Sequence, residues 1–212
     1  HPLMPAPTTA AIVALTAATV GLAFWFEGYA HFILALVALT AVVGVGLNVL
    51  LGLSGQVSLG HVGFYAIGAY VAAILTLKGM SFWLAFPIAG FVAGVLGALL
   101  ALPALRATGP YLAMITIAFA FIVQHVTIEW KVITGGQNGL MGLVPPTLFG
   151  HPFAERETAI FASILAGASL YLFHRLAAGP WGKAMVAVRD SETAARSLGF
   201  NPVAVKTAEI GR

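Results

Sequence analysis

The feature that most constrains this chain is the length of its apolar runs and the scarcity of charge within them. Residues 1–77 carry one formal charge, Glu27. Across the chain 60% of the residues are hydrophobic and 8% are charged, whereas a soluble domain carries roughly a quarter charged residues. An apolar run of about 20 residues can cross a hydrocarbon core of ~30 Å. The sequence therefore predicts an integral membrane protein.

Six apolar segments are predicted to form an all-α polytopic bundle, because a helix hydrogen-bonds its own backbone and lipid cannot. They cover about residues 8–26, 30–53, 62–77, 82–102, 110–128 and 158–175. The third segment is short, and the glycine-rich stretch before it (52–63) favours a broken or re-entrant element. The first segment lacks the basic n-region of a signal peptide.

The distribution of Lys and Arg predicts which loops face the cytoplasm. With the tail after Arg175 placed inside, the inner loops hold seven basic residues and the outer loops three. The inner residues are Arg106, Arg175, Lys183, Arg189, Arg196, Lys206 and Arg212, and the outer residues are Lys78, Lys131 and Arg156. Residues 1–176 are thus expected to be the transmembrane region and 177–212 a cytoplasmic segment. The net charge of +3 is explained by these loops and does not require nucleic acid as a partner.

The sequence contains none of the common catalytic or metal-binding motifs. A GxxxxGK[ST] phosphate loop is absent, because GPWGKA (179–184) lacks both the glycine spacing and the hydroxyl residue. HExxH, GxSxG and cysteine are absent as well. His61 and His125 lie at segment edges, where an interfacial role is favoured over metal ligation. We therefore expect that the chain is not an enzyme and that it binds neither a cofactor nor a metal ion.

Polar residues within or beside the apolar segments are the candidates for function, since they are costly in lipid unless they face protein or water. They are Asn48, Gln56, Ser58, Thr116 and Gln124. Taken singly, each is better explained as a hydrogen-bonding contact between helices. The group within Asn48–Phe64 favours a solute pathway, because interrupted helices frame substrate sites in transporters.

Glycines recur in the apolar segments, and Gly90 and Gly94 form a GxxxG pair. Such a pair lets two helix backbones approach closely in lipid. Packing within the chain is the preferred interpretation, and a dimer signature is the alternative.

The C-terminal segment is unusually charged, with nine of the seventeen formal charges from Arg175 onward. Asp190 or Ser191 is predicted to cap a short helix over ETAARSL, which ends at Gly199. Asn201 and Pro202 would start a second helix. The short helix is too short to be stable alone in water. A docking surface for a soluble partner is favoured over a loop folded back on the chain's own membrane face.

Four blocks in order make the sequence resemble a known family: the LivM-type permease subunits of ABC importers for branched-chain amino acids. The blocks are GLNVLLGLSGQVSLGHVGFYAIGAYVAA (46–73), LRATGPYLAMITIAFAFIV (105–123), TGGQNGL (134–140) and GPWGKAMVAVRDSETAARSLGFNPVAVK (179–206). Together they cover most of residues 40–206. The first forty residues match only in hydrophobicity.

The resemblance implies that the cytoplasmic segment docks into an ATPase subunit. Permeases of ABC importers use an EAA-xxx-G loop for this, and Ala194, Ala195 and Gly199 keep its AA-xxx-G spacing. Thr193 stands at the acidic position and Glu192 one place early. The implied contact rim is formed by Arg189, Asp190, Ser191 and Glu192.

The resemblance also implies the other components of the transporter. These are a second, LivH-like permease, two cytoplasmic ATPase subunits that bind ATP and magnesium, a periplasmic amino-acid-binding protein, and the lipid of the bacterial inner membrane. Leucine, isoleucine or valine would be the substrate. Permeases of this kind continue with further membrane helices, whereas this chain stops at KTAEIGR. A truncated product or fragment is therefore expected.

Three other functions fit parts of the sequence. Permeases for urea or short amides share much of the pattern. A secondary transporter or channel would need no ATPase, but it predicts ionisable relays within the membrane, and Glu27, Glu129 and Glu157 all lie at segment edges. A membrane anchor without transport activity would need no polar residues at mid-depth.

Overall fold

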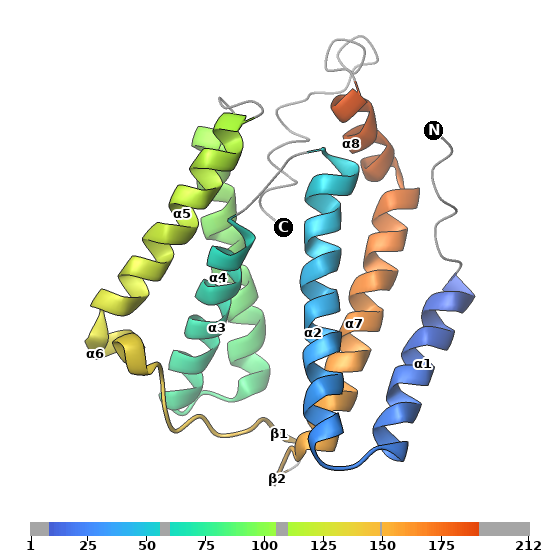
Figure 1. Cartoon of the computed structure of the whole chain (residues 1–212), viewed down its shortest axis with the longest axis vertical. Helices are drawn as coiled ribbons and strands as arrows, with labels where there is room; N and C mark the ends of the chain where they lie inside the picture. Colours follow the sequence, from blue (N-terminus) through green and yellow to red (C-terminus); the bar gives the residue numbers. More distant parts are fainter. Residues whose placement is uncertain (1–8, 56–59, 105–109, 149, 191–212) are drawn as a thin grey trace.

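The computed structural model describes residues 9–55, 60–104, 110–148 and 150–190. The chain in these ranges is almost entirely helical (Figure 1). The long helices are α1 (Thr9–Trp25), α2 (Tyr29–Asn48), α3 (His61–Leu77), α4 (Phe82–Ala104), α5 (Pro110–Glu129) and α7 (Glu155–Ala178). The shorter elements are the π-helix η1 (Val49–Leu53), α6 (Lys131–Thr134), the 3-10 helix η2 (Gly136–Asn138), β1 (Thr147–Leu148), β2 (His151–Pro152) and α8 (Pro180–Asp190).

Each of the six predicted membrane segments is a helix, so the prediction of an all-α polytopic membrane protein is confirmed. Within the described ranges, four helical segments are long and apolar enough to cross a membrane: Tyr29–Leu53, Phe82–Leu100, Tyr111–Glu129 and Glu155–Ala178. The other two, α1 and α3, have 17 residues each. At 1.5 Å per residue they measure roughly 25 Å, slightly less than the hydrocarbon core.

Successive long helices run in alternating directions (Figure 1). The links from α1 to α2 and from α3 to α4 lie at one end of the bundle, together with α6 and the two strands. The C-terminal end of α7 and α8 lie at the opposite end. Such an alternation of helix direction is expected when consecutive helices each cross the membrane once. Lys78, Lys131 and Arg156 belong to the first end, and Arg175, Lys183 and Arg189 to the end with α8.

One group of helices is formed by α7, which packs against both α1 and α2. Its core consists of small side chains, which allow the backbones to approach closely. The buried alanines are Ala23, Ala35, Ala38, Ala159, Ala162 and Ala166. Gly167 of α7 faces Thr16 of α1 so closely that an added Cβ would overlap the threonine side chain. Ser163 is buried in the same interface and donates a hydrogen bond to the Ala159 carbonyl, at 2.8 Å.

A second group is formed by α3, which contacts both α4 and α5. Gly63 lies against the Phe119 ring of α5, and the Phe64 and Phe119 ring centroids are 4.7 Å apart. Gly90 of α4 is exposed, and no described atom comes within 4 Å of a Cβ built there. The preferred interpretation of the GxxxG pair, packing within the chain, is therefore wrong at Gly90 for the described residues, because α4 turns Ala85 and Ala89 inward instead.

An aromatic cluster joins the two groups at the end opposite α8. The ring centroid of Phe161 of α7 lies 5.5 Å from the ring centroid of Trp83 and 6.2 Å from that of Phe82, both on α4. Both pairs are edge to face. Trp83 also donates its indole N–H to the Thr147 carbonyl, at 2.8 Å. Thr147 belongs to the short hairpin of β1 and β2, in which Leu148 pairs with His151. The sequence did not predict this hairpin.

Candidate functional site: the helix break between α2 and α3

The second helix does not end regularly but widens into the π-helix η1. Ser54 follows it, and its backbone N–H donates to the Val49 carbonyl five residues earlier, at 3.4 Å. The Ser54 hydroxyl donates to the same carbonyl, at 3.3 Å, and the side chain is buried. Short π-helical segments in proteins occur frequently at functional sites. The predicted interruption therefore begins at Val49, within the second apolar segment.

Gly55 turns the chain away from η1. Its φ is +67°, a left-handed conformation that costs glycine little and other residues more. A Cβ at this position would also lie 2.6 Å from Cγ of Arg189. Both the backbone conformation and the close approach of Arg189 thus require glycine at this position.

On the far side of the break, α3 begins well inside the bundle. Gly60 precedes its first residue and lies against Thr116 of α5, where an added Cβ would be 2.9 Å from the Thr116 carbonyl oxygen. Thr116 is six residues beyond the start of α5 at Pro110, which corresponds to roughly 9 Å along that helix. The predicted broken element before the third segment is therefore present as a late start of α3.

His61, the first residue of α3, lies against α2. An added Cβ at Gly46 would be 2.9 Å from Nε2 of His61. The imidazole is therefore in contact with the second half of α2, between the two helix groups. This placement is more internal than the interfacial position that the sequence predicts for His61.

The two described candidates for the pathway occupy different environments. Thr116 is 4% exposed, and its hydroxyl donates to the Ala113 carbonyl of its own helix, at 2.9 Å. Its burial against Gly60 favours a packing role. Asn48 is exposed at the junction of α2 and η1, with its side-chain oxygen directly over Gly52. Of the two, only Asn48 is exposed to solvent at the break.

The helix α8 packs onto the same break. Its buried residues Ala184, Met185 and Val188 form an apolar cluster with Leu53 of η1. The guanidinium of Arg189 donates from Nη1 to the Gly52 carbonyl, at 2.7 Å. This bond joins residues 137 positions apart in the sequence. The segment predicted to face an ATPase is thereby in direct contact with the segment predicted to frame the pathway.

The remaining predicted site residues lie outside the described residues. These are Gln56 and Ser58 at the break, and Ser191, Glu192, Ala194, Ala195 and Gly199 in the C-terminal segment. Asp190 is the last residue of α8. Of the two predicted caps, Asp190 is wrong, because it already belongs to the helix that begins at Pro180. The alternative, Ser191, lies outside the described residues.

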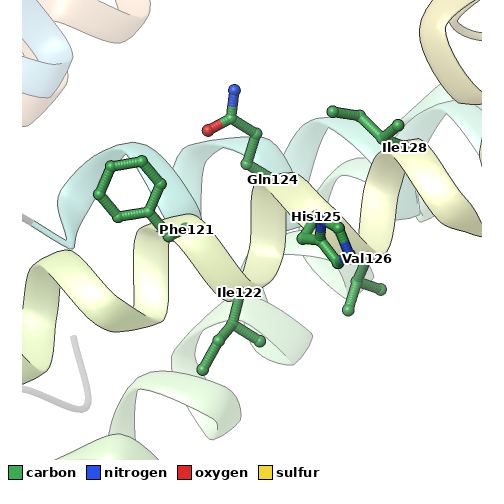
Figure 2. A pocket seen from close by; sticks show the side chains of 6 residues that line it. All are labelled: Phe121, Ile122, Gln124, His125, Val126 and Ile128. Atoms are coloured by element: carbon green, nitrogen blue, oxygen red, sulfur yellow. The ribbon is translucent and has the colours of Figure 1, made fainter.

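A separate apolar hollow of about 430 Å³ lies along the outer side of α5. It is lined by Phe121, Ile122, Gln124, His125, Val126 and Ile128. Figure 2 shows that all six side chains project from successive turns of this one helix. Because a single helix supplies every lining residue, the hollow lacks the convergent polar groups of a ligand site. Within the described ranges, no three His, Asp or Glu side chains come together in a way that could hold a metal ion.

Sequence reasoning included Ser54 and Gly55 in the predicted break without giving either residue a role, and it missed the contact of His61 with α2. A signal for the first two was present, since the dipeptide Ser54–Gly55 is a common turn signal. The sequence contains no pattern that predicts the hydrogen bond between Arg189 and Gly52. Only the three-dimensional structure shows that these two residues are in contact.

Comparison with known proteins gave a consistent set of relatives. A family model described as "Branched-chain amino acid transport system / permease component" matches residues 29–209. The high-affinity branched-chain amino acid transport system permease proteins LivM of Salmonella typhimurium (strain LT2) and Escherichia coli (strain K12) are each 40% identical over 190 residues. Each alignment covers 78% of this chain and 45% of the relative, so the chain spans less than half the length of these relatives. No solved structure matched the chain.

Proposed function

The chain belongs to the family of branched-chain amino acid transport permease components, and from this membership we propose that it moves leucine, isoleucine or valine across the bacterial inner membrane. It would act as one permease subunit of an ABC importer. Energy would come from ATP hydrolysed by separate subunits, which hold the nucleotide and magnesium. The family match over residues 29–209 is the observation that carries this proposal.

The arrangement of the helices supports a transport role rather than a role as a simple anchor. The long helices alternate in direction, and α2 does not end regularly: it widens into the π-helix η1, and the left-handed Gly55 follows before α3 begins at His61. Broken helices present backbone and polar side chains to a solute within the membrane. Amino acids are zwitterions and need such partners at depth. Asn48 is the described side chain best placed to serve them, and Gln56 and Ser58 follow it in the sequence.

Four partners complete the proposed importer: a second, LivH-like permease, two ATPase subunits and a periplasmic binding protein. The end of the bundle that carries α8 would face the cytoplasm, in accord with the excess of Lys and Arg. The ATPase would bind the end of α8 and the segment after it, through Asp190, Ser191 and Glu192 and through Ala194, Ala195 and Gly199 of the AA-xxx-G pattern. ATP binding would favour one state of the permease by interacting differently with its two conformations.

The direct test is uptake by the complete importer reconstituted in vesicles, with the full-length permease and its partner subunits. We expect uptake of labelled leucine that requires ATP inside the vesicle and the binding protein outside. Unlabelled isoleucine and valine should compete, and urea and acetamide should not. Competition by urea alone would replace the substrate with a short amide. Leucine uptake without ATP would make the protein a secondary transporter or channel.

A second test examines the docking segment. Glu192→Lys reverses a charge of the proposed contact rim, and Gly199→Trp places a large side chain where the sequence predicts the end of the short helix. We expect both variants to lose the co-purifying ATPase while the permease remains in the membrane. Lys183→Ala, an exposed change on α8, is the matched control and should retain the ATPase. Retention of the ATPase in both test variants would refute docking through this segment.

A further inference from the structure

Arg189 is turned toward its own chain and not only toward solvent. Its Nη1 donates to the Gly52 carbonyl at 2.7 Å, and its Cγ and Cδ lie over Gly55. The family resemblance implied a place for Arg189 in the contact rim for the ATPase, and the hydrogen bond gives the same side chain a partner within its own chain. A side chain that bonds the end of η1 has a structural partner before any subunit docks.

The electrostatics of the contact suit a cation. The last carbonyls of a helix lack donors within that helix and carry the negative end of its dipole. A guanidinium placed there makes a charge-assisted hydrogen bond, which is shorter and stronger than a neutral one. Gly52 is the fourth of the five residues of η1, so its carbonyl is in this terminal region.

Apolar packing supports the same contact. Ala184, Met185 and Val188 lie on one face of α8 and are buried with Leu53 of η1. Gly55 leaves room for the aliphatic part of the Arg189 side chain. Three contacts therefore connect α8 with η1 and the turn that follows it: the hydrogen bond from Arg189 to Gly52, the apolar cluster with Leu53, and the Arg189 side chain over Gly55.

We propose that Arg189 is a positioning residue that holds α8 against η1, so that the two move as one unit during transport. The proposal rests on the proposed function, since it assigns how docking at the cytoplasmic end reaches the helix break. In sequence, Asp190 and the docking segment follow Arg189 directly, and Gln56 follows Gly55 directly. The contact between Arg189 and Gly52 is thus a short connection between the two.

The first test is Arg189→Ala in the complete importer, with Lys183→Ala as the control on the same helix. We expect the ATPase subunits to remain bound and ATP hydrolysis to continue. Leucine taken up per ATP hydrolysed should fall about tenfold, the equilibrium shift that corresponds to the loss of one hydrogen bond to a charged group. The control should transport normally. A contact-rim role predicts instead that Arg189→Ala loses the ATPase.

A second variant disturbs the contact from the other side without changing a charge. Gly55→Ala places a Cβ against Arg189 and strains a backbone with φ +67°. Gly44→Ala is the matched control on α2, because its Cβ meets no described atom within 4 Å. We expect Gly55→Ala to reproduce the low uptake per ATP of Arg189→Ala, and Gly44→Ala to retain the original ratio.

The deciding test restores the contact covalently. The chain contains no cysteine, so Leu53→Cys and Val188→Cys can be joined by a short thiol cross-linker. If α8 and η1 move as one unit, cross-linking should leave uptake intact in the otherwise unchanged permease. It should also restore uptake per ATP in the Arg189→Ala background. A role of Arg189 in stability alone would not predict this rescue of the ratio.

Each of these experiments has an outcome that would contradict the proposal. Normal uptake per ATP in Arg189→Ala, loss of its ATPase, or loss of uptake on cross-linking the unchanged permease would overturn it. Failure of the unchanged importer to take up leucine with ATP is a separate outcome. That failure would remove the proposed function itself, and the coupling role with it.

Discussion

The first half of α2 packs into a tight core of small side chains, whereas its second half leads into the helix break. Ala35 and Ala38 are buried against α7 in a regular helix. At Gly46 the helix contacts His61, then widens into η1, and beyond Leu53 the left-handed Gly55 turns the chain away. One helix thus combines a region with few ways to move and a region built of turns, glycines and polar contacts. We expect the first half of α2, with α1 and α7, to act as a fixed frame, and the second half with η1 to move during transport.

The largest expected effect tests the frame. Gly167→Leu inserts a side chain where even a Cβ would overlap Thr16. We expect the free energy of unfolding in detergent to fall by roughly 3 kcal/mol, the upper range for overpacking. Gly21→Leu on α1 is the control, since its Cβ meets no described atom. Equal stability of the two variants would show that α1 and α7 are not tightly packed.

A smaller loss is expected at the contact between the two helix groups. Phe161→Ala removes the ring that contacts Phe82, Trp83 and Phe86. Because Phe161 is half-buried, we expect a loss of about 2 kcal/mol, less than for a fully buried ring. Thermal unfolding of the purified permease measures it. Leu172→Ala, an exposed apolar change on the same helix, should alter stability much less.

At the break, function should change more than stability. Gly46→Val places a branched side chain, whose Cβ alone would lie 2.9 Å from Nε2, against the far end of the His61 side chain, which can rotate away. We expect a stability cost of about 1 kcal/mol, the lower end for overpacking, but clearly slower leucine uptake, because the contact of α2 with α3 is altered. Gly44→Val should change neither quantity. Normal uptake in Gly46→Val would mean that this contact does not move during transport.

The smallest effect is expected at Thr116. Thr116→Val keeps the shape and removes a hydroxyl that bonds its own helix. We expect a change of about 0.6 kcal/mol or less and an unchanged KM for leucine. A KM raised severalfold with stability unchanged would instead assign Thr116 to the solute pathway.

The sequence predicted the six helices because length and hydropathy alone decide which segments cross lipid. It predicted the place of the break because glycines and polar residues interrupt an apolar run there. It could not predict which helix faces which. The membrane helices are apolar on nearly all sides, as the exposed Phe91 and Leu99 of α4 illustrate, so no stripe identifies the packed face.

The partners of the site residues could not be predicted either. The bond from Arg189 to Gly52 depends on α8 crossing the end of α2, and nothing near either residue encodes that crossing. The helix α8 itself was not predicted, because the sequence analysis placed the first helix of the cytoplasmic segment after Asp190 or Ser191. Pro at the first position of a helix is in fact favourable. Thr116 was singled out for its polarity, but its burial could only be seen in three dimensions.

The separation of 137 residues between Gly52 and Arg189 also has a consequence for biosynthesis. At about 5–20 residues per second, the ribosome adds the arginine roughly ten seconds after the glycine. Throughout that interval α2 must wait in the translocon or bilayer for α7 and α8 to be made. The end of α2 is therefore expected to be completed late, and to be a point where quality-control proteases distinguish unfinished chains from finished ones.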